Sequence, residues 1–153
     1  MSVRALMNDL AFRWATADDC DRLGAWNREL IDDELHDNPM NARELADRMR
    51  GWLAAEFRAV IFEQRGVPVA YALFREIPEG MHLRQFFVVR TERRRGIGTG
   101  ALALLRLHVF APDKRVLVEA MERNFGGLAF WRSMGFVDRY VGLELAASPR
   151  TAP

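Results

Sequence analysis

The chain has 153 residues, half of them hydrophobic, and its 22 basic and 21 acidic residues give a formal net charge of +1. That balance provides no electrostatic reason to expect a nucleic acid or an anionic membrane as a partner. No apolar stretch approaches the roughly 20 residues that span a bilayer, and residues 1–9 lack the apolar core of a signal peptide. The one cysteine, Cys20, excludes an internal disulfide and fits a reducing, cytoplasmic compartment.

The length and composition predict a single domain over residues 10–146, between a flexible N-terminus at 1–9 and a flexible tail at 147–153. In its first half, Thr16 and Asn41 are suited to begin helices as N-cap residues. Arg65-Gly66 separates two apolar runs and predicts a tight hairpin turn. The elements predicted here are a strand at 10–15, helices at 16–33 and 41–56, and strands at 57–64 and 67–76.

The second half predicts a strand at 82–89, a helix at 96–110 and a strand at 115–120, which together form a parallel crossover. Asn124 begins a last helix, and Gly135 followed by Phe136 predicts a Schellman-type end after Met134. Residues 136–145 predict a final strand. The order of elements indicates a mixed α/β fold with a mostly antiparallel sheet of about six or seven strands, flanked by about four helices.

The run Arg93-Arg94-Arg95-Gly96-Ile97-Gly98, just after the strand predicted at 82–89, is the most informative feature. A glycine turn that opens a helix presents unpaired backbone N–H groups, the helix N-terminus adds a partial positive charge, and the arginines add full charges. These are the groups that hold a pyrophosphate. The run therefore predicts a site for a nucleotide-like cofactor.

Two other interpretations of this turn compete with that prediction. Residues 96–101 also match the dinucleotide fingerprint G-x-G-x-x-G/A, with Glu119 placed to bind a ribose. Against a dinucleotide fold, residues 90–95 separate the strand from the first glycine, and only 34 residues follow Glu119. The other interpretation is a plain glycine turn beside a solvated arginine cluster.

A longer ordered set of residues extends the pattern. It consists of Phe86-Phe87-Val88, Arg93-x-x-Gly96-x-Gly98, Glu119, Asn124 and Phe130-Trp131-x-x-x-Gly135-Phe136. Over residues 82–136 this set resembles the GNAT superfamily of acyl-CoA-dependent N-acetyltransferases. The resemblance implies a GNAT-like fold whose parallel strand pair splays apart, acetyl-CoA as the acyl donor, and a primary amine that attacks the thioester directly.

The resemblance also assigns the cofactor site. The strand that carries Phe86, Phe87 and Val88 would pair its exposed backbone groups with the amide-rich pantetheine arm. Arg93 belongs to the basic run, and the backbone N–H groups of the turn would cradle the pyrophosphate. The cradle residues are Arg94, Arg95, Gly96, Ile97, Gly98 and Thr99. Asn124 matches an asparagine that contacts the cofactor arm, although a plain helix N-cap explains it equally well.

Transfer to an amine requires a base, because an alkylamine with a pKa near 10.4 is neutral in only about one molecule in a thousand at pH 7. Glu119 is the first candidate, since it ends an apolar strand where the cleft should open and matches a general-base glutamate of some members. His82 is the second, and its ordinary pKa near 6.5 suits a base. A solvent-facing position is the alternative for each.

Trp131 departs from the family, many of whose members place a tyrosine there to protonate the leaving thiolate. An indole N–H is no useful acid at neutral pH but still donates one hydrogen bond. A thiol with a pKa of roughly 8.5 can leave as the anion. Tyr140 or Tyr71 are possible replacements, and core packing is the alternative role for Trp131.

The acceptor is expected near the first two helices, where acidic residues surround His36. Asp33, Glu34 and His36 are the predicted acceptor residues of an acidic lip that attracts a cationic amine; a solvated charged surface is the alternative. The favoured function is therefore acetylation of a small cationic amine. Alternatives are acetylation of a protein N-terminus or lysine, and a catalytically silent CoA-binding sensor. We predict no metal site and consider a homodimer possible.

Overall fold

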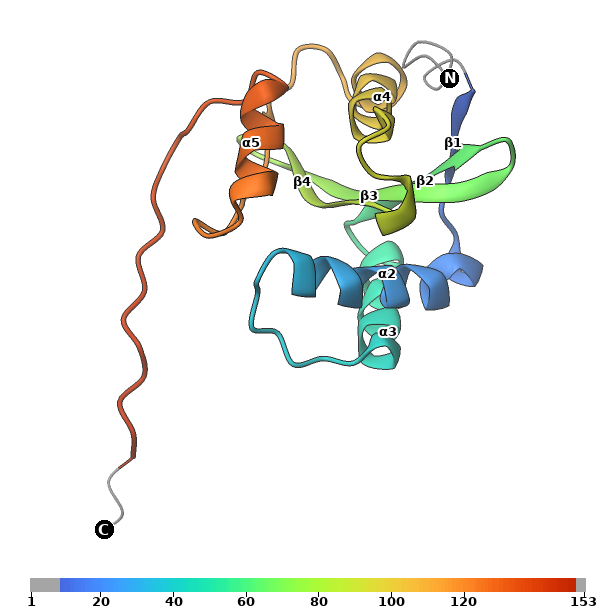
Figure 1. The fold of residues 1–153 in the computed structure, drawn as a ribbon. Helices are drawn as coiled ribbons and strands as arrows, with labels where there is room; N and C mark the ends of the chain where they lie inside the picture. The colour runs from blue at the N-terminus through green and yellow to red at the C-terminus, as the bar shows by residue number, and fades with distance from the viewer. Residues whose placement is uncertain (1–8, 151–153) are drawn as a thin grey trace.

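The computed structural model describes residues 9–150, and at its centre lies a five-stranded sheet with helices on both faces (Figure 1). The strands follow one another in chain order across the sheet, from β1 to β5. The elements are β1 (Leu10–Trp14), η1 (Ala17–Asp19), α2 (Cys20–Asp33), α3 (Ala42–Leu53), β2 (Arg58–Gln64), β3 (Val67–Ile77), β4 (Gly80–Val88), η2 (Arg90–Glu92), α4 (Ile97–Leu104), its π-helical extension η3 (Leu105–Val109), β5 (Val116–Leu117) and α5 (Phe125–Ser133). Helices α2 and α3 cover one face, whereas α4 and α5 lie on the other.

Local signals set the helix ends, as predicted. The Asn41 side chain accepts a hydrogen bond from the backbone N–H of Glu44 at 2.9 Å, which begins α3. At the end of α5, Gly135 has a φ of 94°, and the N–H of Phe136 donates to the carbonyl of Trp131 at 3.0 Å. This is the predicted Schellman-type ending. Helix α3 ends at Leu53, three residues before the predicted end at 56.

The strands β1 to β4 are antiparallel, and their alternating side chains supply two hydrophobic cores. Toward α4, the core contains Phe62 and Phe74 from the sheet and Leu105 from the helical side. Toward α2 and α3, the core contains Tyr71 and Phe87 together with Leu23 and Met49. The turn between β2 and β3 lies at Arg65-Gly66, where both residues have positive φ, as the predicted hairpin requires.

The mixed α/β class is confirmed, but two predicted strands are wrong in extent or existence. The strand predicted at 115–120 shortens to β5, because this segment diverges from β4 after two paired positions. The strand predicted at 136–145 does not form. Many of its residues are apolar, but a strand also needs a neighbour that offers N–H and C=O groups, and this segment runs away from the sheet (Figure 1). The sheet therefore has fewer strands within residues 9–150 than predicted.

The segment after α5 leaves its apolar side chains in solvent. Val141, Leu143 and Leu145 are each more than four-fifths exposed. Residues 1–8 and 151–153, which belong to the two ends predicted to be flexible, lie outside the described residues. None of the helices in the described range is long and apolar enough to cross a membrane.

Candidate active site

The candidate site begins where β4 and β5 separate. The two strands pair in parallel only at Met81 with Val116 and at His82 with Leu117. Beyond His82, residues 83–88 of β4 have no strand partner on that side within the described chain. The strand therefore presents free backbone N–H and C=O groups to a cleft, as the resemblance implied, and an amide-rich ligand can pair with such an edge.

A β-bulge in β4 sets the side chains around this cleft. Leu73 of β3 faces Gln85, whereas Phe74 faces Leu83, so Arg84 is an extra residue in the ladder. After the bulge, Gln85 lies on the side of α2 and α3, where its side-chain oxygen accepts a hydrogen bond from the Tyr71 hydroxyl at 2.8 Å. The bulge turns the Arg84 side chain outward, toward the cleft and solvent.

The glycine turn has the geometry expected of an anion cradle. Arg94 and Gly96 both have positive φ, at 62° and 83°, and α4 begins immediately afterwards. The first backbone hydrogen bond of α4 runs from Gly100 to Gly96, at 3.0 Å. The N–H groups of Ile97, Gly98 and Thr99 precede it and are the unpaired donors of the helix N-terminus. This arrangement suits a pyrophosphate.

Asp33 holds the segment between β4 and α4. Its carboxylate accepts from Arg90 at 2.9 Å and from Arg93 at 2.6 Å. Arg93 also donates from Nε to the carbonyl of Val88 at 2.8 Å, which fixes the end of β4. Asp33 was predicted to contact the acceptor, and in the structure its carboxylate pairs with two arginines of the segment that precedes the glycine turn. The role of Arg90 has no local sequence signal.

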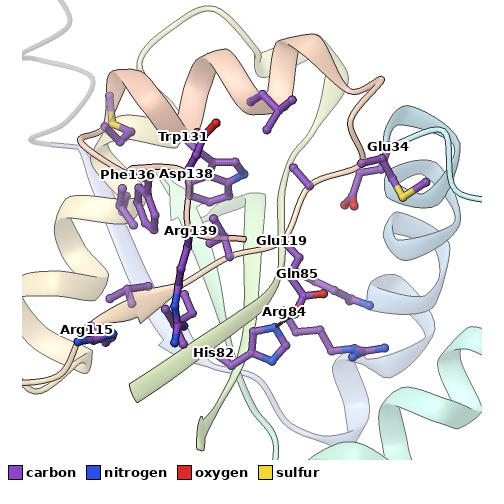
Figure 2. Close-up of a pocket in the computed structure, with 18 of the residues that line it drawn as sticks. Glu34, His82, Arg84, Gln85, Arg115, Glu119, Trp131, Phe136, Asp138 and Arg139 are labelled. Atoms are coloured by element: carbon purple, nitrogen blue, oxygen red, sulfur yellow. Dashed lines mark ion pairs between the residues drawn. The ribbon is translucent and has the colours of Figure 1, made fainter. Parts of the chain in front are cut away.

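The two predicted base candidates lie together at the point where the strands separate. His82 Nε2 is 3.3 Å from Glu119 Oε1, and Figure 2 joins them by a dashed line. The His82 side chain is 12% exposed and that of Glu119 is 66% exposed. Burial lowers the pKa of His82, as do the nearby charges of Arg84 and Arg75, while Glu119 opposes them. His82 is thus neutral at pH 7 and able to accept a proton, with a carboxylate placed to stabilise its charged form.

The two tyrosines differ in their access to this pair. Tyr71 is fully buried, and burial raises its pKa well above its usual value. Tyr140 belongs to the exposed segment after α5, and burial and then the adjacent Glu119 raise its pKa. Of the two, only Tyr140 is therefore near the candidate reacting groups.

Glu34 and His36 line the cleft, whereas Asp33 does not line it. Burial, followed by the charge of Asp33, raises the pKa of Glu34 to about 7. In Figure 2, Glu34 enters the pocket from the side opposite Trp131 and Phe136. Glu34 is thus partly protonated at neutral pH. Of the three residues predicted to form an acidic lip, the partly buried Glu34 and the exposed His36 line the cleft.

Phe86 and Trp131, both expected near the cofactor, belong to one aromatic cluster, whereas Phe87 packs with Trp26 and Tyr71 on the other face of the sheet. Trp131 packs on Phe86 with ring centroids 5.4 Å apart and on Phe130 and Phe136 at 5.0 Å each. Trp131 also lines the cleft, so a packing role and a wall of the cleft coexist. The Asn124 side chain accepts from the N–H of Gly127 at 3.1 Å, which is the helix-cap role.

Three features were not predicted as parts of the site. They are the bulge at Arg84, the cleft-lining Arg48 of α3, and the interaction of both guanidinium groups with the ring of Trp52. All three depend on contacts between distant segments, for which a single sequence carries no local signal.

Comparisons with known proteins agree with this geometry. A model of the acetyltransferase (GNAT) family matches residues 25–136. The fold resembles that of a possible acetyltransferase from Clostridium difficile 630, with a TM-score of 0.72 and 14% identity over 92% of this chain and 99% of the other. An aminoglycoside N-acetyltransferase, AAC(6')-Iy, in complex with CoA gives 0.70 and 13% identity over 90% and 94%.

A third solved structure is that of a predicted acetyltransferase from Clostridium acetobutylicum with acetyl-CoA. It gives a TM-score of 0.68 and 20% identity over 90% of this chain and 96% of the other. A search of curated proteins finds no match. The structural likenesses establish the fold, and the family match establishes the class of protein.

Proposed function

The chain belongs to the GNAT family of acetyltransferases, and on this premise we propose that it transfers the acetyl group of acetyl-CoA to a primary amine of a small molecule by direct attack on the thioester. The observation that carries the proposal is the His82–Glu119 pair, which lies where β4 and β5 separate and beside the free edge of β4. The edge offers a place for the donor arm, and the pair offers a base next to it.

The donor is assigned to the edge of β4 and the turn before α4. Backbone groups of Phe86, Phe87 and Val88 would pair with the pantetheine arm, and the N–H groups of residues 94–99 would hold the pyrophosphate. The positive φ of Gly96 and the unpaired donors at the start of α4 support this assignment. Trp131 and Asn124 would then flank the arm from α5.

The acceptor amine must lose a proton before or during attack. We assign His82 as the group that takes this proton, because it is largely buried, neutral and within reach of the cleft. Glu119 then stabilises the resulting imidazolium at Nε2. The sequence favoured Glu119 over His82 as the base. The structure leads us to prefer His82, because the exposed Glu119 carboxylate forms an ion pair with it.

The leaving thiolate has no tyrosine at position 131 to protonate it. A thiol with a pKa of about 8.5 can leave as the anion, and the positive N-terminal end of α4, on the donor side, favours negative charge there. Tyr140, beside Glu119, is the phenol that could supply a proton, whereas the buried Tyr71 hydroxyl is committed to Gln85.

A second candidate function is that of a CoA-binding sensor without catalysis, and the observation in its favour is Trp131. Release of free thiol from acetyl-CoA, measured with a panel of primary amines, separates the two. The transferase predicts amine-dependent release. Tight binding of acetyl-CoA with no release above the amine-free rate, for any amine, would refute the transferase.

We also propose that the protein is cytoplasmic and that it forms a homodimer through residues 137–145. The exposed apolar side chains of Val141, Leu143 and Leu145 stand at alternate positions, which lie on one face of an extended segment. The edge strand β5 of a second copy offers the unpaired backbone that such a segment needs.

A further inference from the structure

Two arginines face the cleft without a carboxylate partner. Arg48 of α3 and Arg84 of β4 both line the cleft, and neither forms an ion pair within residues 9–150. Their guanidinium carbons lie 4.3 and 4.8 Å from the ring centroid of Trp52. One indole thus gathers two positive charges that are 36 positions apart in the sequence.

Placing these two guanidinium groups side by side disfavours the folded state unless an anion binds between them. Arg48 donates from Nη2 to Asn27 at 3.2 Å, but its Nε is buried without a hydrogen-bond partner. Burial and then the charge of Arg84 lower the pKa of Arg48. An unsatisfied donor and a like charge both disfavour a partly buried guanidinium, so fold stability alone does not account for the position of Arg48. Such groups in a cleft indicate a binding function.

The arginines lie within reach of the proposed reacting groups. Arg84 lies two residues after His82 on β4, at the bulge. Figure 2 shows the Arg84 side chain extending from the strand next to His82. The charges of Arg84 and Arg75 also act on His82 and lower its pKa, while Glu119 opposes them, so positive charge lies close to this end of the cleft. An amine at His82 that carries an anionic group a few bonds away would place that group beside the arginines.

On the basis of the proposed function, we propose that the acceptor is a free amino acid or a similar small zwitterion, whose carboxylate is bound by Arg48 and Arg84 while its amine faces His82 and Glu119. A guanidinium matches a carboxylate with two parallel hydrogen bonds. Asp33, which would have favoured a purely cationic acceptor, is occupied by Arg90 and Arg93. The partly buried Glu34 is left to attract the ammonium form.

The test compares acceptors that differ only at the carboxylate. Thiol release from acetyl-CoA gives kcat and KM for a set of L-amino acids, their carboxamides and the corresponding decarboxylated amines. Arg84→Gln and Arg48→Gln are measured beside Arg43→Gln, an exposed arginine of α3 outside the cleft. Calorimetry measures binding of the same acceptors to protein saturated with CoA, which needs no turnover, and binding of acetyl-CoA to each variant.

The wild type should prefer the best amino acid over its carboxamide by at least about tenfold in kcat/KM, equivalent to about 1.4 kcal/mol. Arg84→Gln and Arg48→Gln should abolish this preference through KM, whereas Arg43→Gln and the Kd of acetyl-CoA should not change. Because Arg84 is exposed, Arg84→Gln should fold and can test the proposal even if Arg48→Gln unfolds. Equal use of carboxamides or amines by the wild type, or a preference that survives Arg84→Gln, would overturn the inference.

Failure of the proposed function gives a different result. If acetyl-CoA binds but no acceptor elicits thiol release, the transferase is refuted, and the calorimetric comparison alone decides the carboxylate site. Amino acids that bind the CoA-saturated protein more tightly than their carboxamides, with the difference lost in Arg84→Gln, support the site. Equal affinities overturn it.

Discussion

Gly98→Glu perturbs the proposed cofactor site at a position whose protein surroundings the structure defines. A Cβ on Gly98 would lie 3.2 Å from Cε2 of Phe130, so a side chain there enters the space between α4 and α5. We place the pyrophosphate at the same end of α4. Two unit charges about 5 Å apart repel by about 0.8 kcal/mol at a dielectric constant of ~80 and by about 3.3 kcal/mol at ~20. The Kd of acetyl-CoA should therefore rise by about fourfold to about 250-fold.

The assay is titration calorimetry with acetyl-CoA, with Gly98→Gln as the matched control. Glutamine has nearly the same size as glutamate, so it reproduces the crowding against Phe130 without the charge. The difference between the two variants should shrink at high salt, because ions screen exposed charges. Equal Kd values for Gly98→Glu and Gly98→Gln, or a Gly98→Glu variant that binds like the wild type, would refute the placement of the pyrophosphate.

Three further predictions concern residues around the cleft and the end of the chain. Asp33→Asn should raise the Kd of acetyl-CoA a few-fold, because each of its two ion pairs is worth about 0.2–1 kcal/mol. It should leave the acceptor KM unchanged, with Asp37→Asn as the control. A raised acceptor KM in Asp33→Asn would contradict this role of Asp33. Folding raises the pKa of Glu34 from 4.5 to about 7, so the folded state binds the extra proton and stability falls as pH rises through this range. In thermal melts across these pH values, Glu34→Gln should lose this decline, and an unchanged slope would contradict the assignment. Leu143→Ser with Leu145→Ser should convert dimer to monomer in sedimentation, and an already monomeric wild type would refute the proposed dimer.

The parts of the fold that the sequence predicts well are those with local causes. Asn41 caps α3 through the N–H of a residue three positions later, and Gly135 ends α5 through bonds within one turn. The apolar residues within 136–145, by contrast, favour a strand but carry no information on whether a neighbouring strand is present. That segment was predicted as a strand, but it pairs with no strand of residues 9–150.

The parts of the candidate site that the sequence predicts are likewise those with local causes. The turn at Gly96 is local and was predicted, as were His82 and Glu119, although as alternatives. The register that pairs His82 with Leu117 brings Glu119, two residues on, next to the imidazole, and a single sequence does not specify that register. The pairing of Arg48 with Arg84 through Trp52 depends on the packing of α3 against the sheet and was not predicted.

The central claim is that the point where β4 and β5 separate is the catalytic centre, with His82 and Glu119 acting as one unit. The most direct test measures amine-dependent thiol release across pH for wild type, His82→Gln, Glu119→Gln and the double variant. We predict that His82→Gln lowers kcat by about 10²-fold, that the double variant is no worse than His82→Gln, and that the acetyl-CoA Kd is unchanged in all three. Because Glu119 raises the pKa of His82, Glu119→Gln should move the acid limb of the profile to lower pH. Wild-type rates in His82→Gln, or losses that add in the double variant, would contradict the claim.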